Sequence, residues 1–140
     1  MGVSTDSSFV LVSEFTGSRI TKYWLTGPKA DTAELLADKP GPANMKLNMP
    51  GDYWVATNVG TPMVPTAMRM DKNGKILETI SFDGPPYNGN AITEVHEDLG
   101  DLYLGTIYVD FVAVHEGVTA DKKTNLLGAA AKLAEEFYPY

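Results

Sequence analysis

Three side chains in the last third of the sequence have the spacing of metal ligands. Glu94, His96 and Asp98 occupy alternate positions, and alternate residues of an extended strand share one face. Carboxylate and imidazole ligands on one face can hold a divalent metal ion. The same pattern is typical of an exposed strand face, because charged residues are rarely buried without partners, and we favour that interpretation. We also interpret His115, which precedes Glu116, as part of a surface pair.

Residues 71–74, Asp-Lys-Asn-Gly, are similar to the start of a calcium loop. No glutamate follows at the distance that such a loop requires, and Asn and Gly tolerate the positive φ of a tight turn. We therefore predict a hairpin turn. Elsewhere the sequence has no nucleophile elbow, phosphate loop, dinucleotide fingerprint or zinc spacing. It also has no cysteine, which excludes disulfides and thiolate chemistry.

The composition is that of a globular domain and argues against two classes of partner. The 140 residues are 44% hydrophobic and 21% charged, as in ordinary folded domains. The net charge of -7 repels phosphate backbones and anionic membrane surfaces, so we expect no nucleic-acid and no membrane partner. Residues 1–8 are polar and no long apolar run occurs, so we expect neither a signal peptide nor a membrane span.

The strands expected to position these side chains follow from a repeated sequence pattern. A turn followed by a short apolar strand recurs at Phe9, Tyr53 and Leu102, at intervals of about 44 and 49 residues, near the length of a propeller blade. After each pattern a broader strand is expected, at 19–25, at 67–70 paired with 76–80, and at 111–114. Short inner strands are expected before the second and third patterns, at 45–48 and 92–96. Each unit is then a small antiparallel sheet.

Two further groups of apolar residues add to this plan. The aromatic pairs Tyr23-Trp24 and Tyr53-Trp54 are expected to pack between neighbouring sheets rather than to line a pocket. Residues 124–137 carry apolar side chains at helical spacing, which predicts an amphipathic helix that docks on an apolar edge. We therefore divide the chain into a β-sheet part, residues 1–118, and a helical tail, residues 119–140.

Four segments of the sequence are distinctive enough to indicate a protein family. These segments are Asp-Ser-Ser-Phe-Val-Leu-Val-Ser-Glu-Phe at 6–15, Lys-Tyr-Trp-Leu-Thr-Gly-Pro-Lys at 22–29, Pro-Ala-Asn-Met-Lys-Leu-Asn at 42–48 and Leu-Tyr-Leu-Gly-Thr at 102–106. Over residues 2–114 the chain resembles the strictosidine synthase-like family. The resemblance implies a six-bladed β-propeller with its site on the central axis. It also implies amine-aldehyde condensation in alkaloid-type biosynthesis, while other members resemble lactonases and arylesterases.

A ring of this family needs more than twice the 140 residues of this chain. The expected fold is therefore all-β, a partial six-bladed propeller of about two and a half to three blades with a C-terminal amphipathic helix. Two copies would complete one ring by pairing open blade edges, so a homodimer is an open alternative.

The resemblance also suggests the site residues. It puts Thr93 where the synthases carry their catalytic glutamate, and a threonine hydroxyl is no base at neutral pH. Glu94 faces the other side of the strand and replaces that base only after a one-residue slip. Ala91 and Asn44 fall at substrate-binding positions. Asn44 is also a candidate calcium ligand, but Ala43 stands where metal-binding relatives carry Asp. We therefore expect Asn44 to close a turn, and expect no metal or other cofactor.

Three functions stay open from the sequence. The first is a strictosidine synthase-like protein that acts on a small molecule but is catalytically impaired by Thr93. The second is a metal-dependent esterase or lactonase, and the third is a non-catalytic binding or self-assembling half-propeller. The family suggests the secretory pathway or the vacuole as the location.

Overall fold

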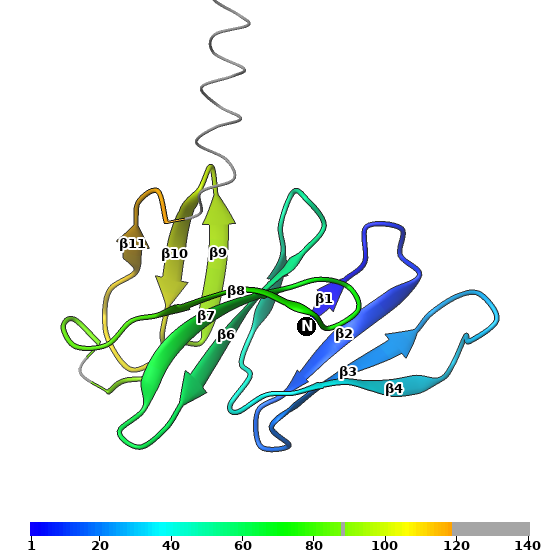
Figure 1. The fold of residues 1–140 in the computed structure, drawn as a ribbon, viewed down its shortest axis with the longest axis horizontal. Helices are drawn as coiled ribbons and strands as arrows, with labels where there is room; N and C mark the ends of the chain where they lie inside the picture. The colour runs from blue at the N-terminus through cyan, green and yellow to red at the C-terminus, as the bar shows by residue number, and fades with distance from the viewer. Residues whose placement is uncertain (88, 119–140) are drawn as a thin grey trace, which may run out of the picture.

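The computed structural model describes residues 1–87 and 89–118, and these form three antiparallel sheets (Figure 1). Within these residues every regular element is a β-strand, so the predicted all-β class is confirmed. The expected helix over residues 124–137 lies outside the described residues.

Each sheet is built from strands that follow one another along the chain. The first sheet contains β1 (Gly2–Val3), β2 (Phe9–Glu14), β3 (Arg19–Trp24) and β4 (Ala33–Asp38). The second contains β5 (Met45–Leu47), β6 (Tyr53–Val59), β7 (Val64–Met70) and β8 (Ile76–Ser81). The third contains β9 (Glu94–Asp98), β10 (Asp101–Gly105) and β11 (Ala113–His115). Up-and-down sheets of this size, set side by side, are the blades of a propeller.

The repeated pattern takes the same place in every sheet, because it forms β2, β6 and β10, each the second strand of its sheet in chain order. The expected inner strands are β5 and β9, although β9 starts two residues later than predicted. The hairpin predicted at residues 71–74 joins β7 to β8. There the Asp71 carboxylate accepts the backbone N–H groups of Asn73 at 2.8 Å and Lys75 at 2.9 Å. Gly74 has a φ of 84°.

Two strands were not predicted. β1 contains two residues, which is too short to carry a periodic pattern. β4, with the sequence Ala-Glu-Leu-Leu-Ala-Asp, lacks the alternation of a half-buried strand. It pairs with β3 all the same, with a register shift between Ile20 and Thr21.

The second sheet lies between two separate hydrophobic cores. Side chains at alternate positions of β6 point to opposite faces, so Tyr53 and Val55 pack toward the first sheet while Trp54 and Ala56 pack toward the third. The core with the first sheet contains Phe9, Leu11, Ile20, Met45, Tyr53, Val55, Met68 and Met70. The core with the third contains Trp54, Ala56, Ala67, Phe82, Tyr87, Ile92, Val95, Leu102 and Leu104.

The aromatic pairs were expected to pack between sheets rather than to line a pocket, and this holds in full for Trp54, whereas Tyr53 and Trp24 also border a cavity between the first and second sheets. Tyr53 and Trp54 are buried between sheets, and Trp24 packs edge-on against Phe9 with ring centroids 5.5 Å apart. Tyr23 instead lies on the surface and donates a hydrogen bond to Asp31 at 3.2 Å.

A buried carboxylate joins the second sheet to the third. Glu97 on β9 accepts the indole N–H of Trp54 at 2.6 Å and the side-chain amide of Asn48 at 3.1 Å. A buried charge needs such donors to offset its loss of hydration. These contacts fix the orientation of β9 against β6.

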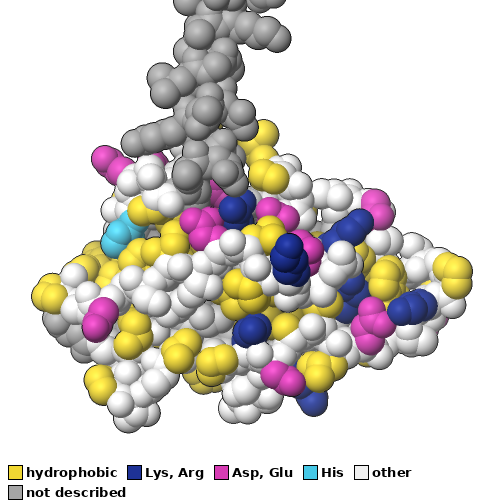
Figure 2. Space-filling model, viewed as in Figure 1, with side chains coloured by type: hydrophobic (Ala, Val, Ile, Leu, Met, Phe, Trp, Pro, Cys, Tyr) yellow, Lys and Arg dark blue, Asp and Glu magenta, His cyan; other side chains and the backbone are white. Residues whose placement is uncertain are grey.

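Charged side chains of both signs are interspersed on the face shown in Figure 2. No helix within the described residues is long and apolar enough to cross a membrane.

Candidate axial site

Two residues that the sequence placed in a site lie together where the inner strands begin. Asn44 precedes β5 and Thr93 precedes β9. The backbone N–H of Asn44 donates to the Thr93 carbonyl at 3.0 Å. The starts of the inner strands of two neighbouring sheets are therefore directly bonded.

The segment before β9 is clamped from both neighbouring sheets. The buried Asn58 side chain forms two hydrogen bonds of 2.9 Å with the backbone of Ile92, one to its carbonyl and one from its N–H. From the third sheet, the Thr106 hydroxyl donates to the Ala91 carbonyl at 2.7 Å. The Thr93 N–H donates to the Gly105 carbonyl at 2.8 Å. The position of Thr93 is thus fixed by contacts with two sheets.

Sequence reasoning missed Asn58, although a signal was present. Asn58 follows Trp54 and Ala56 at alternate positions of β6, on the face that packs toward the third sheet. A polar residue on such an apolar face must find a partner, and the backbone of Ile92 is that partner.

Thr93 is half-buried, and its hydroxyl lies 3.4 Å from the Gly105 carbonyl, to which it donates. Val95 and Glu97 follow it at alternate positions and are buried. Thr93 therefore stands on the side of the strand that faces the second sheet, and no carboxylate occupies its position.

Glu94 lies on the opposite face of the strand. The ladder between β9 and β10 runs without a shift from Glu94↔Gly105 to Asp98↔Asp101, so the slip that would exchange Glu94 for Thr93 is not present. His96 and Asp98 share that face and are exposed, which agrees with a solvated strand face. The described residues contain no group of three or more His, Cys, Asp or Glu that would hold a metal ion.

Glu94 faces a cation on the neighbouring inner strand. Its Oε2 atom lies 3.8 Å from the Lys46 ammonium, while its Oε1 atom is buried and makes no hydrogen bond with the described residues. The amino group of Met1 is close enough that Glu94 raises its pKa, although burial outweighs this and lowers the pKa overall. Glu94 thus belongs to a small charged cluster.

The two positions expected to contact substrate differ in exposure. Ala91 is buried, so its side chain offers only a packed methyl group. Asn44 is exposed, and its backbone carbonyl accepts the Ala56 N–H at 3.0 Å. The backbone of Asn44 therefore continues the pairing of β5 with β6 and does not close a turn, so this expectation is wrong, and its side chain makes no hydrogen bond with the described residues.

The expectation for His115 is wrong. Its Nε2 atom is 2.9 Å from the Tyr87 hydroxyl, and its ring lies 4.4 Å from that of Phe82. Burial lowers the pKa of His115. The adjacent Glu116 suggested a surface pair, but the loop after β8 folds over the imidazole and supplies its partners.

Comparison with known proteins identifies relatives over most of the chain. Strictosidine synthase of Catharanthus roseus is 36% identical over 129 residues, which cover 88% of this chain and 36% of that protein. Strictosidine synthase-like proteins 12 and 11 of Arabidopsis thaliana are 39% and 37% identical over 117 residues, or 80% of this chain and 35% of each relative. No family model matches the chain.

These matches confirm the resemblance to the strictosidine synthase-like family. The chain spans about a third of the length of these relatives. Among solved structures, a luciferin-regenerating enzyme matches 88% of this chain and 40% of its own with a TM-score of 0.58. The sequence identity is 15%, so this match supports the propeller-type fold and nothing further.

Proposed function

We propose that this relative of the strictosidine synthases forms part of the wall of an axial small-molecule site but lacks the base for amine-aldehyde condensation. The observation that carries the proposal is the placement of Thr93. It occupies the position that the resemblance assigns to the synthase glutamate, and its hydroxyl is directed at the Gly105 carbonyl.

The chemistry explains why this replacement matters. After an amine and an aldehyde form an iminium and the ring closes, a carboxylate must remove the ring proton. A positioned base contributes about 10²–10⁴-fold to such a step. A threonine hydroxyl bound to a backbone carbonyl has no basic form at neutral pH. The carboxylate next to it in sequence, Glu94, is on the other face of β9 and 3.8 Å from the Lys46 ammonium.

A condensation assay tests the chain directly. Incubated with tryptamine and secologanin, it should form no product above the uncatalysed rate, with the Catharanthus roseus strictosidine synthase as the positive control. Product above that rate contradicts the proposal. Thr93→Glu should not create activity, because a base without a complete pocket supplies only part of the rate enhancement.

A reciprocal substitution separates the effect of this position from the effect of chain length. In the Catharanthus roseus relative, the residue aligned with Thr93, which the resemblance gives as the catalytic glutamate, is replaced by threonine. We expect condensation to fall about 10²–10⁴-fold without loss of the folded state. Retention of full activity would refute the assignment of Thr93, whatever the short chain does.

Substrate contact at the wall has its own measurement. Tryptamine should shift the backbone amide signals of Asn44 and Thr93 in an NMR titration. Leu99, in the turn between β9 and β10, serves as an exposed control that should not shift. Equal shifts at all three amides would argue against a defined site.

A further inference from the structure

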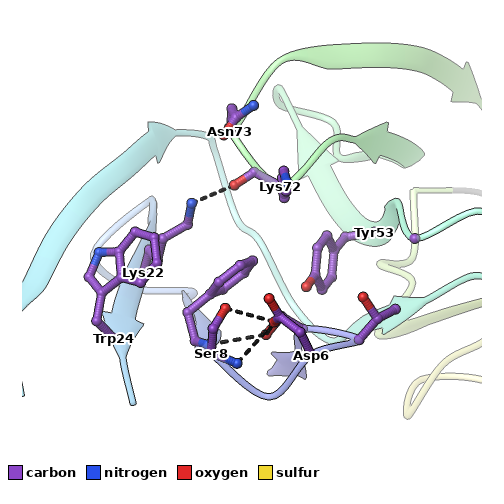
Figure 3. A pocket seen from close by; sticks show the side chains of 11 residues that line it. Asp6, Ser8, Lys22, Trp24, Tyr53, Lys72 and Asn73 are labelled. Atoms are coloured by element: carbon purple, nitrogen blue, oxygen red, sulfur yellow. Dashed lines mark hydrogen bonds between the residues drawn. The ribbon is translucent and has the colours of Figure 1, made fainter. Parts of the chain in front are cut away.

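A second concavity lies between the first and second sheets and shares no residue with the axial site. It has a volume of about 320 Å³ and is open to solvent on one side. Its walls come from the loop between β1 and β2, from β2 and β3, from the start of β6 and from the hairpin between β7 and β8 (Figure 3). A volume of this size accommodates a small organic molecule.

Lys22 is the unusual residue of this pocket. It follows Ile20 at alternate positions of β3, on the face that packs toward the second sheet, and only 4% of the residue is exposed. One of its N–H groups donates to the Lys72 carbonyl at 2.6 Å. The ammonium lies 4.4 Å from the centre of the Phe9 ring and 5.0 Å from that of Trp24.

The charge of Lys22 has no counter-ion in contact. Within the described residues, the ion pairs do not include Lys22, and burial lowers its pKa. An ammonium has three donors, and the backbone carbonyl of Lys72 uses one. Contact with aromatic faces offsets part of the lost hydration. An anion in the pocket would offset the rest and take the remaining donors.

A second donor faces the same space. The Tyr53 side chain is buried, borders the pocket, and its hydroxyl makes no hydrogen bond with the described residues. Burial, and secondarily the charge of Asp6, raises the pKa of Tyr53 to about 12. The phenol therefore keeps its proton at neutral pH and is able to donate it in a hydrogen bond.

Asp6 is the anion of the pocket, and its own loop already engages it. Its Oδ1 atom accepts the Ser4 hydroxyl at 2.8 Å, the Ser8 hydroxyl at 2.7 Å and the Ser8 N–H at 3.0 Å (Figure 3). These bonds lower the pKa of Asp6 to about 2. The carboxylate thus shapes the loop between β1 and β2, while the donors of Lys22 and Tyr53 are not satisfied in this way.

We propose that this pocket binds a small organic carboxylate. Its carboxylate group takes donors from the Lys22 ammonium and the Tyr53 hydroxyl, and its apolar part lies against the rings of Phe9 and Trp24. The site is independent of the proposed axial function.

Three aromatic probes of similar size and different charge test this proposal on the full chain by NMR. Phenylacetate carries the carboxylate, benzyl alcohol is neutral and 2-phenylethylamine is a cation. Phenylacetate should shift the indole N–H signal of Trp24 and bind at least about tenfold more tightly than benzyl alcohol. The indole N–H of Trp54 reports on the other core and should not shift. Tighter binding of the amine, or no shift at Trp24 up to about 10 mM phenylacetate, overturns the proposal.

Variants then identify the donor. Lys22→Met keeps the apolar stem and removes a buried charge, a change that folded proteins often tolerate. It should abolish the preference for phenylacetate over benzyl alcohol. The matched control is Lys29→Met, because Lys29 lies 5.4 Å from the Trp24 ring but pairs with Glu34 outside the pocket. It should leave the preference unchanged. Loss in both variants, or in neither, contradicts the role of Lys22.

Discussion

Asn58→Ala should destabilise the fold by an amount that the structure allows us to work out. The substitution removes two hydrogen bonds of 2.9 Å to the backbone of Ile92. Ile92 is fully buried, so both its N–H and its carbonyl would lose their partner away from water. Each unsatisfied group costs about 1–3 kcal/mol, so the two groups together give an expected loss of about 2–6 kcal/mol. A domain is stabilised by only about 5–15 kcal/mol, so the effect is large.

Urea unfolding followed by circular dichroism measures this loss. The midpoint should fall while the slope with denaturant is unchanged, because the surface exposed on unfolding is nearly the same. Native-state hydrogen exchange should show the Ile92 amide among those that lose most protection. Asn44→Ala is the matched control, since its side chain is exposed and makes no hydrogen bond with the described residues.

The two variants together decide whether the clamp operates as described. Asn44→Ala should change the free energy of unfolding by less than about 0.5 kcal/mol. If Asn58→Ala costs no more than this control, the Asn58–Ile92 bonds do not hold the segment before β9. Equal and large losses in both variants would instead indicate that amide side chains matter here for another reason.

Two further predictions concern a turn and a titrating residue. In urea unfolding, Gly74→Ala should cost at least about 1 kcal/mol more than Gly27→Ala. Both glycines have a φ of 84°, but only at Gly74 would an added Cβ lie 2.8 Å from the carbonyl oxygen of Leu36. Equal costs would contradict this close contact. Burial lowers the pKa of His115, so the unfolded chain binds the proton more readily and the free energy of unfolding should decrease as pH falls through about 6.5. This decrease should be smaller in His115→Gln when unfolding is compared at about pH 7.5 and 5.5; an unchanged decrease in His115→Gln would refute the assignment.

The parts of the fold that were predictable are those encoded by neighbouring residues. Each repeated pattern combines turn-forming residues with an apolar strand, and all three form the second strand of their sheet, β2, β6 and β10. The hairpin over residues 71–74 depends on Asp71 and Gly74, which are three positions apart. Local patterns of this kind do not require knowledge of the tertiary structure.

The missed features depend on partners that are distant in sequence. Asn58 meets Ile92 across 34 positions, and Tyr87 meets His115 across 28. Lys22 lies in the distinctive segment 22–29, but its burial depends on how the hairpin at Lys72 folds over β3. Side-chain chemistry at these positions was visible in the sequence, whereas its surroundings were not.

The position of the second sheet between two cores has a consequence for how such a molecule can change over time. Because alternate residues of β6 serve different cores, a replacement at Val55 alters one interface and a replacement at Ala56 alters the other. Energetic coupling of this kind is nearest-neighbour, as in repeat proteins. Substitutions could therefore accumulate at the pocket between the first and second sheets, bordered by Tyr53, without disturbing the Trp54–Glu97 contact on the opposite face. The two regions proposed to bind ligands are in this sense free to evolve independently.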